Sequence, residues 1–185
     1  IATTGDIKVE SLEGVSKEAK AQLKLLRKKR HSHVVWLEER WIWDLIQPCV
    51  RMANTNAGWN FEWDWTEPCQ FTKYRKGQYY GWHCDSWDNP YHAPGSPKDG
   101  KIRKLSTILM LSDNKDYSGG DLEMNPRQHD PEKKEEVKNQ VLKVKELQGK
   151  GSLVVFPSFV WHRVTPVTKG LRYSVPAWHL GKPWK

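Results

Sequence analysis

The sequence predicts a mainly β protein, a β-sandwich or jelly roll with helices packed outside it. Two observations lead to this fold class: helical patterns come first in the chain, and roughly eight short strand patterns follow after residue 58. The 185 residues, 37% of them hydrophobic, suffice for one domain with a real core. We therefore expect a single domain over residues 1–185, with N-terminal helical support over 1–58 and a β-rich core over 59–185.

The N-terminal part carries two helical patterns. The first covers residues 16–27, where Ser16 is the expected N-cap and apolar residues recur at helical spacing. The second helix is expected from about residue 37 to 53, with Pro48 bending it. Both helices are expected to pack on one sheet.

After residue 58 short apolar or alternating segments are separated by turn residues, which is typical of strands. A long loop is expected over residues 86–101, since it holds three prolines and two glycines, and a charged insertion near 126–140. The expected strands cover residues 60–65, 70–74, 78–85, 104–112, 121–124, 141–147, 152–156, 161–167 and 171–180.

Composition limits the setting and the partners. The formal net charge of +8 allows a nucleic-acid partner, but basic residues are not interleaved with aromatic ones, so solubility is the preferred interpretation. Three widely spaced cysteines without a CxxC pair argue against disulfides or structural zinc and for an intracellular, cytoplasmic setting. No apolar run reaches the roughly 18 residues that a membrane span needs. The chain begins at Ile1, so a truncated N-terminus stays open.

Tryptophan is unusually frequent, with eleven residues in the chain. Several of them, including Trp82 and Trp87, lie close to a His-x-Asp triplet. Such a cluster can form the wall of a substrate groove or can pack against the N-terminal helices. Both interpretations of Trp82 and Trp87 stay open at this stage.

Three side chains form a candidate metal site. On an extended segment residues i and i+2 face the same side, so His83 and Asp85 can bind one metal ion while Cys84 points away. The triplet alone also fits a surface loop. His162, at the start of a later strand, completes a set of two histidines and one carboxylate, which leaves open positions on Fe(II).

Arg172 and Ser174 are expected on one face of the last strand. A guanidinium beside a hydroxyl makes a specific carboxylate site, and an arginine in an apolar strand requires a fixed anionic partner. An oxo-acid such as 2-oxoglutarate can fill two positions on the iron and dioxygen the third, with its far carboxylate on Arg172. The alternative for Arg172 is a surface ion pair.

The same residues lie in motifs of a known family. Residues 70–85, QFTKYRKGQYYGWHCD, resemble the Tyr-x-x-Gly-x-x-Tyr-x-x-His-x-Asp motif of prolyl 4-hydroxylase-type Fe(II)- and 2-oxoglutarate-dependent dioxygenases. GGDLE at 119–123, GSLVVFPS at 151–158, HRVTPV at 162–167 and GLRYS at 170–174 resemble the motifs of the C-terminal half. The resemblance covers roughly residues 68–180. An arginine rather than a lysine at position 172 favours the microbial or viral branch.

The resemblance implies a double-stranded β-helix, a cupin-like jelly roll, and further roles for individual residues. Tyr74 matches the tyrosine whose hydroxyl helps to bind the cosubstrate, and Arg103 lies where the family faces its peptide substrate. Leu109 and Leu111 are candidates for the apolar wall beside the cosubstrate, or for core packing. Asp85 implies hydroxylation, since related halogenases replace this carboxylate. Ascorbate is expected to support the activity.

Several functions stay open. The first is hydroxylation of proline in a peptide or protein, coupled to oxidative decarboxylation of 2-oxoglutarate. A second is hydroxylation of a free amino acid or another small molecule, and the loop 86–101 would decide between the two as an open groove or a closed lid. A non-catalytic jelly-roll binding module leaves the candidate site without a use. Oxidative demethylation of nucleic acid shares the iron chemistry but is disfavoured by the motif that precedes His83.

Overall fold

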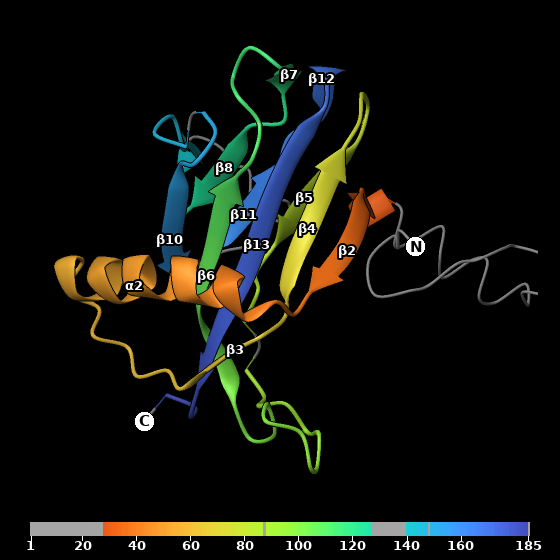
Figure 1. Ribbon diagram of the computed structural model, residues 1–185. Coiled ribbons are helices and arrows are strands. Elements are labelled where there is room, and N and C mark those ends of the chain that lie inside the picture. Colours follow the sequence, from red (N-terminus) through yellow and green to blue (C-terminus); the bar gives the residue numbers. More distant parts are fainter. Residues whose placement is uncertain (1–27, 87, 127–139, 148, 185) are drawn as a thin grey trace, which may run out of the picture.

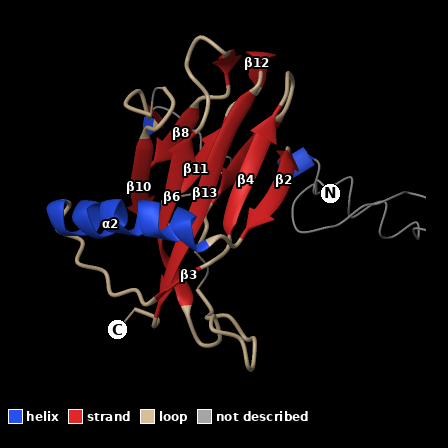
Figure 2. Cartoon of the chain, in the orientation of Figure 1, coloured by secondary structure: helices blue, strands red, loops and turns tan. Residues whose placement is uncertain are grey.

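Two facing β-sheets with one long helix on the outside form the described part of the molecule (Figure 1). The computed structural model describes residues 28–86, 88–126, 140–147 and 149–184. Figure 2 shows the predominance of strands over helix, and the prediction of a mainly β fold with a helix outside the sheets is confirmed. The predicted helix at residues 16–27 and most of the predicted charged insertion lie outside the described residues.

The larger sheet has the strand order β10-β6-β13-β4-β2, with β3 paired to one end of β13. All these pairs are antiparallel. The strands of this sheet are β2 His33–Leu37, β3 Trp65–Thr66, β4 Cys69–Tyr74, β6 Ile102–Met110, β10 Leu153–Pro157 and β13 Arg172–Gly181.

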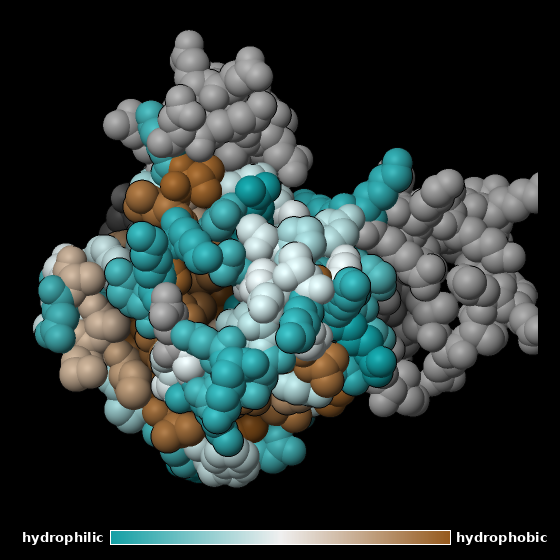
Figure 3. Space-filling view, turned by 90° about the horizontal axis from the view of Figure 1, so that it is seen from above, coloured by the Kyte–Doolittle hydropathy of each residue, from teal (hydrophilic) through white to brown (hydrophobic). Residues whose placement is uncertain are grey.

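The facing sheet has the order β1-β5-β11-β8-β9, and a two-stranded ribbon, β12-β7, lies beyond it. These strands are β1 Arg30–His31, β5 Tyr79–His83, β7 Tyr117–Gly119, β8 Leu122–Asn125, β9 Leu142–Lys143, β11 Trp161–Val164 and β12 Val167–Gly170. Seen from above, the molecule presents mostly hydrophilic side chains, with hydrophobic ones between them (Figure 3).

Helix α2 Arg40–Asn56 crosses the outer face of the larger sheet (Figure 1). Its buried residues Ile42, Ile46 and Val50 recur every fourth position, so they form one stripe along the helix. This stripe packs on Leu105 and other apolar residues of the sheet, which makes the main hydrophobic core. The helix lies within a few residues of the predicted bounds and contains Pro48, as expected.

Successive side chains of β6 and β13 point to opposite faces of the larger sheet. One face packs against α2 in the core, and the other faces the cavity between the sheets. Leu105 and Leu109 pack in the core under α2, whereas Ile108 and Met110 face the space between the sheets. Of the two interpretations of Leu109 and Leu111, core packing is the observed one, since both pack against the helix side. Ile108 lines the cavity instead, one residue away along the strand.

The N-terminal support is not only helical. β1 joins the smaller sheet by pairing with β5, and β2 joins the larger sheet by pairing with β4. The run of valine, tryptophan and leucine in β2 suits a strand, but two helical patterns flank it in the sequence. Two predicted strands are also shorter than expected: residues 60–65 contribute only the start of β3, and residues 141–147 only β9.

Candidate metal centre and cosubstrate cavity

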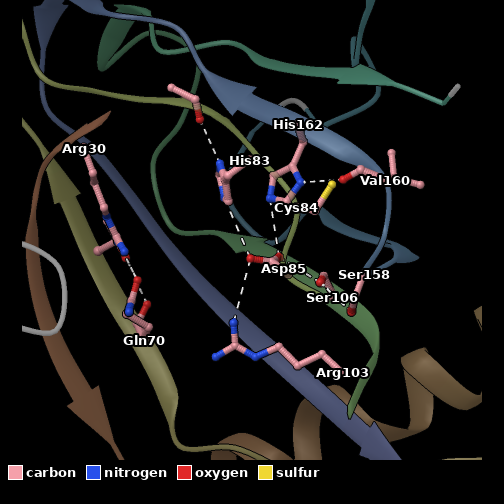
Figure 4. A network of polar contacts seen from close by, with 12 residues as sticks. Arg30, Gln70, His83, Cys84, Asp85, Arg103, Ser106, Ser158, Val160 and His162 are labelled. Atoms are coloured by element: carbon pink, nitrogen blue, oxygen red, sulfur yellow. Dashed lines mark hydrogen bonds and ion pairs between the residues drawn. The ribbon is translucent and has the colours of Figure 1, made fainter. Parts of the chain in front are cut away.

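His83, Asp85 and His162 meet between the two sheets. His83 ends β5 and pairs directly with His162 on β11, so the antiparallel register brings the two rings together. One donor atom from each of the three residues lies within 4.8 Å of the others. Nε2 of His162 lies 3.4 Å from Oδ2 of Asp85, and Nε2 of His83 lies 3.8 Å from Oδ1 (Figure 4). The three side chains therefore converge as the sequence predicts.

Backbone carbonyls fix both imidazole rings. Nδ1 of His83 hydrogen-bonds the Gly81 carbonyl oxygen at 2.8 Å, and Nδ1 of His162 hydrogen-bonds that of Val160 at 2.9 Å. If each Nδ1 carries the proton it donates, each Nε2 has a free lone pair directed at Asp85. Burial, and then His162, lower the pKa of His83 well below its usual value, so this ring is neutral. Two imidazoles and a carboxylate suit a divalent metal ion.

A β-bulge in β5 shapes this centre. His162 pairs with His83, but Val164 pairs with Tyr80, so the β5 strand contains one extra residue. Tyr80 and His83 consequently face the same side although they are three positions apart, and their rings stack at 3.6 Å between centroids. Gly81 sits within the bulge, where an added Cβ would lie 3.2 Å from the Lys29 carbonyl oxygen.

The Asp85 carboxylate is held from several sides. Its backbone N–H donates to the Ser158 carbonyl at 2.9 Å, and Ser106 Oγ donates to Oδ2 at 2.8 Å. Ser106 Oγ also contacts Ser158 Oγ at 2.9 Å. Burial raises the pKa of Asp85, but attraction to His162, His83 and Arg103 outweighs it and lowers that pKa to about 2. Asp85 is thus an oriented, ionised ligand group.

Tyr74, Arg172 and Ser174 come together at the other end of the same cavity. Arg172 pairs with Tyr74 across β13 and β4, and its guanidinium carbon lies 5.4 Å from the centre of the tyrosine ring. Ser174 accepts a hydrogen bond from Arg172 Nη1 at 2.9 Å. These three residues and the three candidate metal ligands line one cavity.

The Arg172 guanidinium is buried without an anion. Its side chain is 1% exposed, and Nε has no hydrogen-bond partner within the described residues. Among those residues no carboxylate lies within ion-pair distance of it. A buried guanidinium is stable only with a compensating anion, so the cavity fits a ligand that brings its own carboxylate. The residues present therefore fit an acidic cosubstrate such as 2-oxoglutarate beside a metal ion.

A wider cleft adjoins this cavity, and Asp85 borders both. Arg103 lines the cleft, where Nε donates to Glu67 at 3.1 Å and Nη2 makes a second, shorter contact with the same oxygen. The guanidinium also stacks over Trp178 at 4.0 Å and lies 3.9 Å from Asp85. The other lining side chains include the aromatic residues Trp36, Trp65, Tyr80 and Tyr91.

Trp82 does not line this cleft, contrary to one of its two interpretations. It neighbours His83 on β5, and its ring lies instead under Arg163 of the adjacent strand, at 4.9 Å. His162 and Arg163 alternate in the same way, so the side chains beside the two histidines face outward. The predicted helix at 16–27 lies outside the described residues, so packing of Trp82 against it stays a prediction. Trp87 lies outside the described residues.

Several residues at the site were not predicted. Arg30 reaches the cleft from β1, and Glu67 neutralises Arg103 from the segment before β4. Trp178 lines both cavities from β13. The alternation that placed Arg172 and Ser174 on the inner face of β13 also includes Trp178, so that signal was present in the sequence. Arg30 belongs to a run of basic residues, and nothing in that run distinguishes it.

The structure is a jelly roll with one cavity that holds two histidines, a carboxylate and a buried arginine. This combination defines a class of proteins that bind a single metal ion and an acidic ligand. The family described as the 2OG-Fe(II) oxygenase superfamily matches residues 69–180, more than half of the chain. The chain belongs to this family, and the resemblance to prolyl 4-hydroxylase-type dioxygenases is confirmed at that level.

Known relatives agree with this assignment. A PKHD-type hydroxylase of Shewanella oneidensis is 35% identical over 112 residues, which cover 60% of this chain and 42% of that protein. The chain thus spans about two fifths of the length of the curated relatives it matches.

Solved structures share the fold. The viral collagen prolyl hydroxylase from Paramecium bursaria Chlorella virus-1 has a TM-score of 0.59 at 19% identity, covering 87% of this chain and 84% of that one. A prolyl hydroxylase from Trichoplax adhaerens, in complex with a hypoxia inducible factor peptide fragment, has a TM-score of 0.55 at 22% identity, covering 81% and 63%. Both likenesses support the jelly-roll architecture. No helix in the described part of the chain is long and apolar enough to cross a lipid bilayer.

Proposed function

We propose that the chain is an Fe(II)- and 2-oxoglutarate-dependent hydroxylase. His83, Asp85 and His162 would hold the iron, and Arg172, Tyr74 and Ser174 would bind the far carboxylate of 2-oxoglutarate. The observation that carries the proposal is the shared cavity: three converging ligand groups at one end and an uncompensated buried guanidinium at the other. Membership in the 2OG-Fe(II) oxygenase superfamily supports it.

Bound iron, 2-oxoglutarate and dioxygen supply oxidative decarboxylation coupled to hydroxylation of a C–H bond. The protein's own groups act around that chemistry. The Gly81 and Val160 carbonyls orient the two imidazoles, and Ser106 orients the carboxylate. Arg172 and Ser174 fix the direction of the cosubstrate, and burial of the whole centre excludes water. The carboxylate at position 85 supports hydroxylation as the outcome.

For the substrate we propose proline in a peptide or protein. The relative from Shewanella oneidensis is named a PKHD-type hydroxylase, and the Trichoplax adhaerens enzyme is described with a peptide fragment. The open cleft beside Asp85, lined by Arg103 and aromatic side chains, offers room for such a chain. Ascorbate would support turnover. Free thiols at Cys49, Cys69 and Cys84 favour a reducing, intracellular setting.

A free amino acid or small molecule remains the second candidate. The loop 86–101 favours the peptide, because its residues Tyr91 and Lys98 form part of the wall of the open cleft and the loop is held by contacts within itself. The Tyr91 and Lys101 backbones hydrogen-bond each other at 2.9 Å, and Asp99 accepts from the Ala93 N–H at 2.7 Å. A binding module without catalysis would have no use for the converging ligand groups.

The test is succinate formation from 2-oxoglutarate by the full chain with Fe(II) and ascorbate, together with a mass-spectrometric screen of proline-containing peptides for one added oxygen. We expect 2-oxoglutarate turnover in the native protein and its loss in His83→Ala and His162→Ala. His92→Ala, on the exposed loop, is the matched control and retains turnover. Native rates in both ligand-site variants would contradict the proposed function.

A further inference from the structure

The cleft beside the candidate metal centre has an excess of positive charge. Three cations line it, namely Arg30, Lys98 and Arg103, against the carboxylates of Glu67 and Asp85. Asp85 is committed to the candidate iron, whose charge it offsets together with the cosubstrate. The part of the cleft left for a substrate therefore holds three cations and one carboxylate.

The two arginines of the cleft differ in their partners. Arg103 is neutralised by Glu67, and both side chains are nearly buried, with 12% and 8% of their surface exposed. Within the described residues Arg30 has neutral hydrogen-bond partners: Nε donates to Ser32 Oγ at 2.8 Å, and Nη2 donates to Gln70 Oε1. Among the described residues no carboxylate lies within ion-pair distance of Arg30. The charge of Arg30 is thus available to a ligand.

Arg30 is also held in place before any ligand arrives. The pairing of Arg30 with Tyr80 sets its backbone, and its guanidinium lies over the Tyr80 ring at 4.5 Å. Tyr80 in turn stacks on His83. The contacts with Ser32 and Gln70 occupy two of the five N–H donors that a guanidinium carries, so three remain for a ligand. Such a fixed fork matches a carboxylate.

The position of Arg30 connects this charge with the reaction. Arg30 lines both the wide cleft and the inner cavity that contains the candidate iron ligands. Figure 4 shows its side chain beside Gln70 and apart from Arg103. A carboxylate bound there would lie close to the carbon that is oxidised. Lys98, which has no carboxylate partner in the described part of the chain, adds a second cation at the cleft.

We infer that Arg30 is a carboxylate-binding residue of the substrate cleft, and that the physiological substrate carries an acidic group next to the hydroxylated residue. The carboxylate is either an acidic side chain or a chain end of the substrate. The inference rests on the proposed function, because it assigns the cleft to the substrate of that reaction. It also gives the two arginines different roles: Arg103 is held in an ion pair with Glu67, and Arg30 binds the substrate carboxylate.

The test uses paired proline-containing peptides that differ only in Glu against Gln at one flanking position at a time. A further pair differs in a free against an amidated C-terminus, which distinguishes a chain end from a side chain. Binding to the full chain is followed by tryptophan fluorescence, since Trp36, Trp65 and Trp178 line the cleft. It is measured with and without Mn(II) and 2-oxoglutarate, and hydroxylation is measured separately.

We expect the acidic member of at least one pair to bind roughly tenfold to a hundredfold more tightly, the range that a hydrogen-bonded charge contributes. In Arg30→Gln this ratio should fall close to one, and Arg30→Glu should reverse it in favour of a Lys-containing peptide. The ratio compares the affinities of two peptides for the same variant. Partial unfolding lowers both affinities by the same factor, so it does not change their ratio. Arg51→Gln is the matched control, since Arg51 also lies over an aromatic ring but outside the cleft, and it should leave the ratio unchanged.

Two results would overturn the inference: equal binding of every pair by the native protein, or an unchanged preference in Arg30→Gln. A charge preference that depends on Arg30 without any hydroxylation or succinate formation would refute the proposed function and retain the carboxylate site. The failure of one assignment is thereby distinguished from the failure of the other.

Discussion

Gly120 leaves the space that the Arg172 side chain occupies. A Cβ added at Gly120 would lie 2.9 Å from Cδ of Arg172 and 2.9 Å from a methyl carbon of Val167. The guanidinium of Arg172 therefore reaches the cavity only because position 120 has no side chain. The glycine pair at 119 and 120 supports the cosubstrate end of the site from behind, in addition to linking β7 to β8.

Gly120→Ala should move the Arg172 side chain and raise the 2-oxoglutarate requirement about tenfold or more, since a displaced guanidinium loses a charged hydrogen bond. Gly120 has a φ of +64°, so the substitution also strains the backbone. Gly58→Ala controls for this strain, because Gly58 has a φ of +70° and nothing near its added Cβ. The KM for 2-oxoglutarate and the melting temperature of both variants check the prediction. Equal KM values for 2-oxoglutarate in Gly120→Ala and Gly58→Ala would contradict the steric role of Gly120.

Arg172→Ala should raise the 2-oxoglutarate requirement by roughly two orders of magnitude while metal binding stays nearly intact, because the guanidinium lies at the far end of the cavity. Metal binding is followed with Mn(II), and cosubstrate binding by titration. Arg163→Ala is the control, since that arginine already pairs with Glu123 on the outer side of β11. An unchanged requirement in Arg172→Ala would exclude the arginine from cosubstrate binding.

Ser106→Ala should weaken metal binding about tenfold without removing a ligand, because outer hydrogen bonds orient ligating carboxylates. The serine hydroxyl donates to Asp85 at 2.8 Å and is buried. The Mn(II) affinity of Ser106→Ala is compared with that of Ser118→Ala, where the serine is exposed on β7. Identical affinities would show that the Ser106 hydroxyl is not needed to orient the carboxylate.

His179 should make the fold sensitive to acid. Burial, and then Arg51, lower the pKa of His179 to about 3, from an ordinary value of 6.5. Below pH 6.5 the unfolded chain binds a proton that the folded protein does not, so the free energy of unfolding falls as the pH drops from about 6.5 towards 3. The slope for one such group approaches ~1.4 kcal/mol per pH unit.

Urea unfolding across this range, in the native protein and in His179→Gln, isolates that contribution. The difference between the two unfolding free energies should shrink as the pH falls and stay constant above pH 7. His92→Gln, on the exposed loop, is the control and should follow the native slope. A difference that does not vary with pH would show that His179 does not titrate in this way.

The candidate ligands were predictable because they lie on strands or, for Asp85, two residues after one, where alternation decides which side chains meet. His83 and Asp85 at i and i+2, and Arg172 and Ser174 likewise, follow that rule directly. The order of the family motifs along the sequence then predicted that these distant strands meet at one site. The same rule fails where the strand is irregular: the bulge in β5 places Tyr80 beside His83 at a spacing of three, and no sequence period marks it.

Other parts depend on contacts far apart in the sequence. Nothing in the sequence marks Glu67 as the partner of Arg103, because the two residues meet only in the folded protein. The sequence left cavity wall and core packing open for Leu109, because a register difference of one residue decides between them. The short strands β1 and β2 were hidden between two helical patterns, because a strand of two to five residues leaves little periodicity to detect. The position of Arg30 at the cleft depends on the pairing of β1 with β5, so the sequence did not predict it.

Residues 30–37 complete both sheets at once, since β1 lies on β5 and β2 on β4. Shortening the protein to start after residue 37 would leave the backbone amides and carbonyls of two long strands open to solvent on the same side of the molecule. Unprotected strand edges recruit other chains by adding strands to themselves. A shortened protein of this kind should therefore self-associate into larger particles as well as lose Arg30, and expression trials would have to retain this segment to obtain a monodisperse sample.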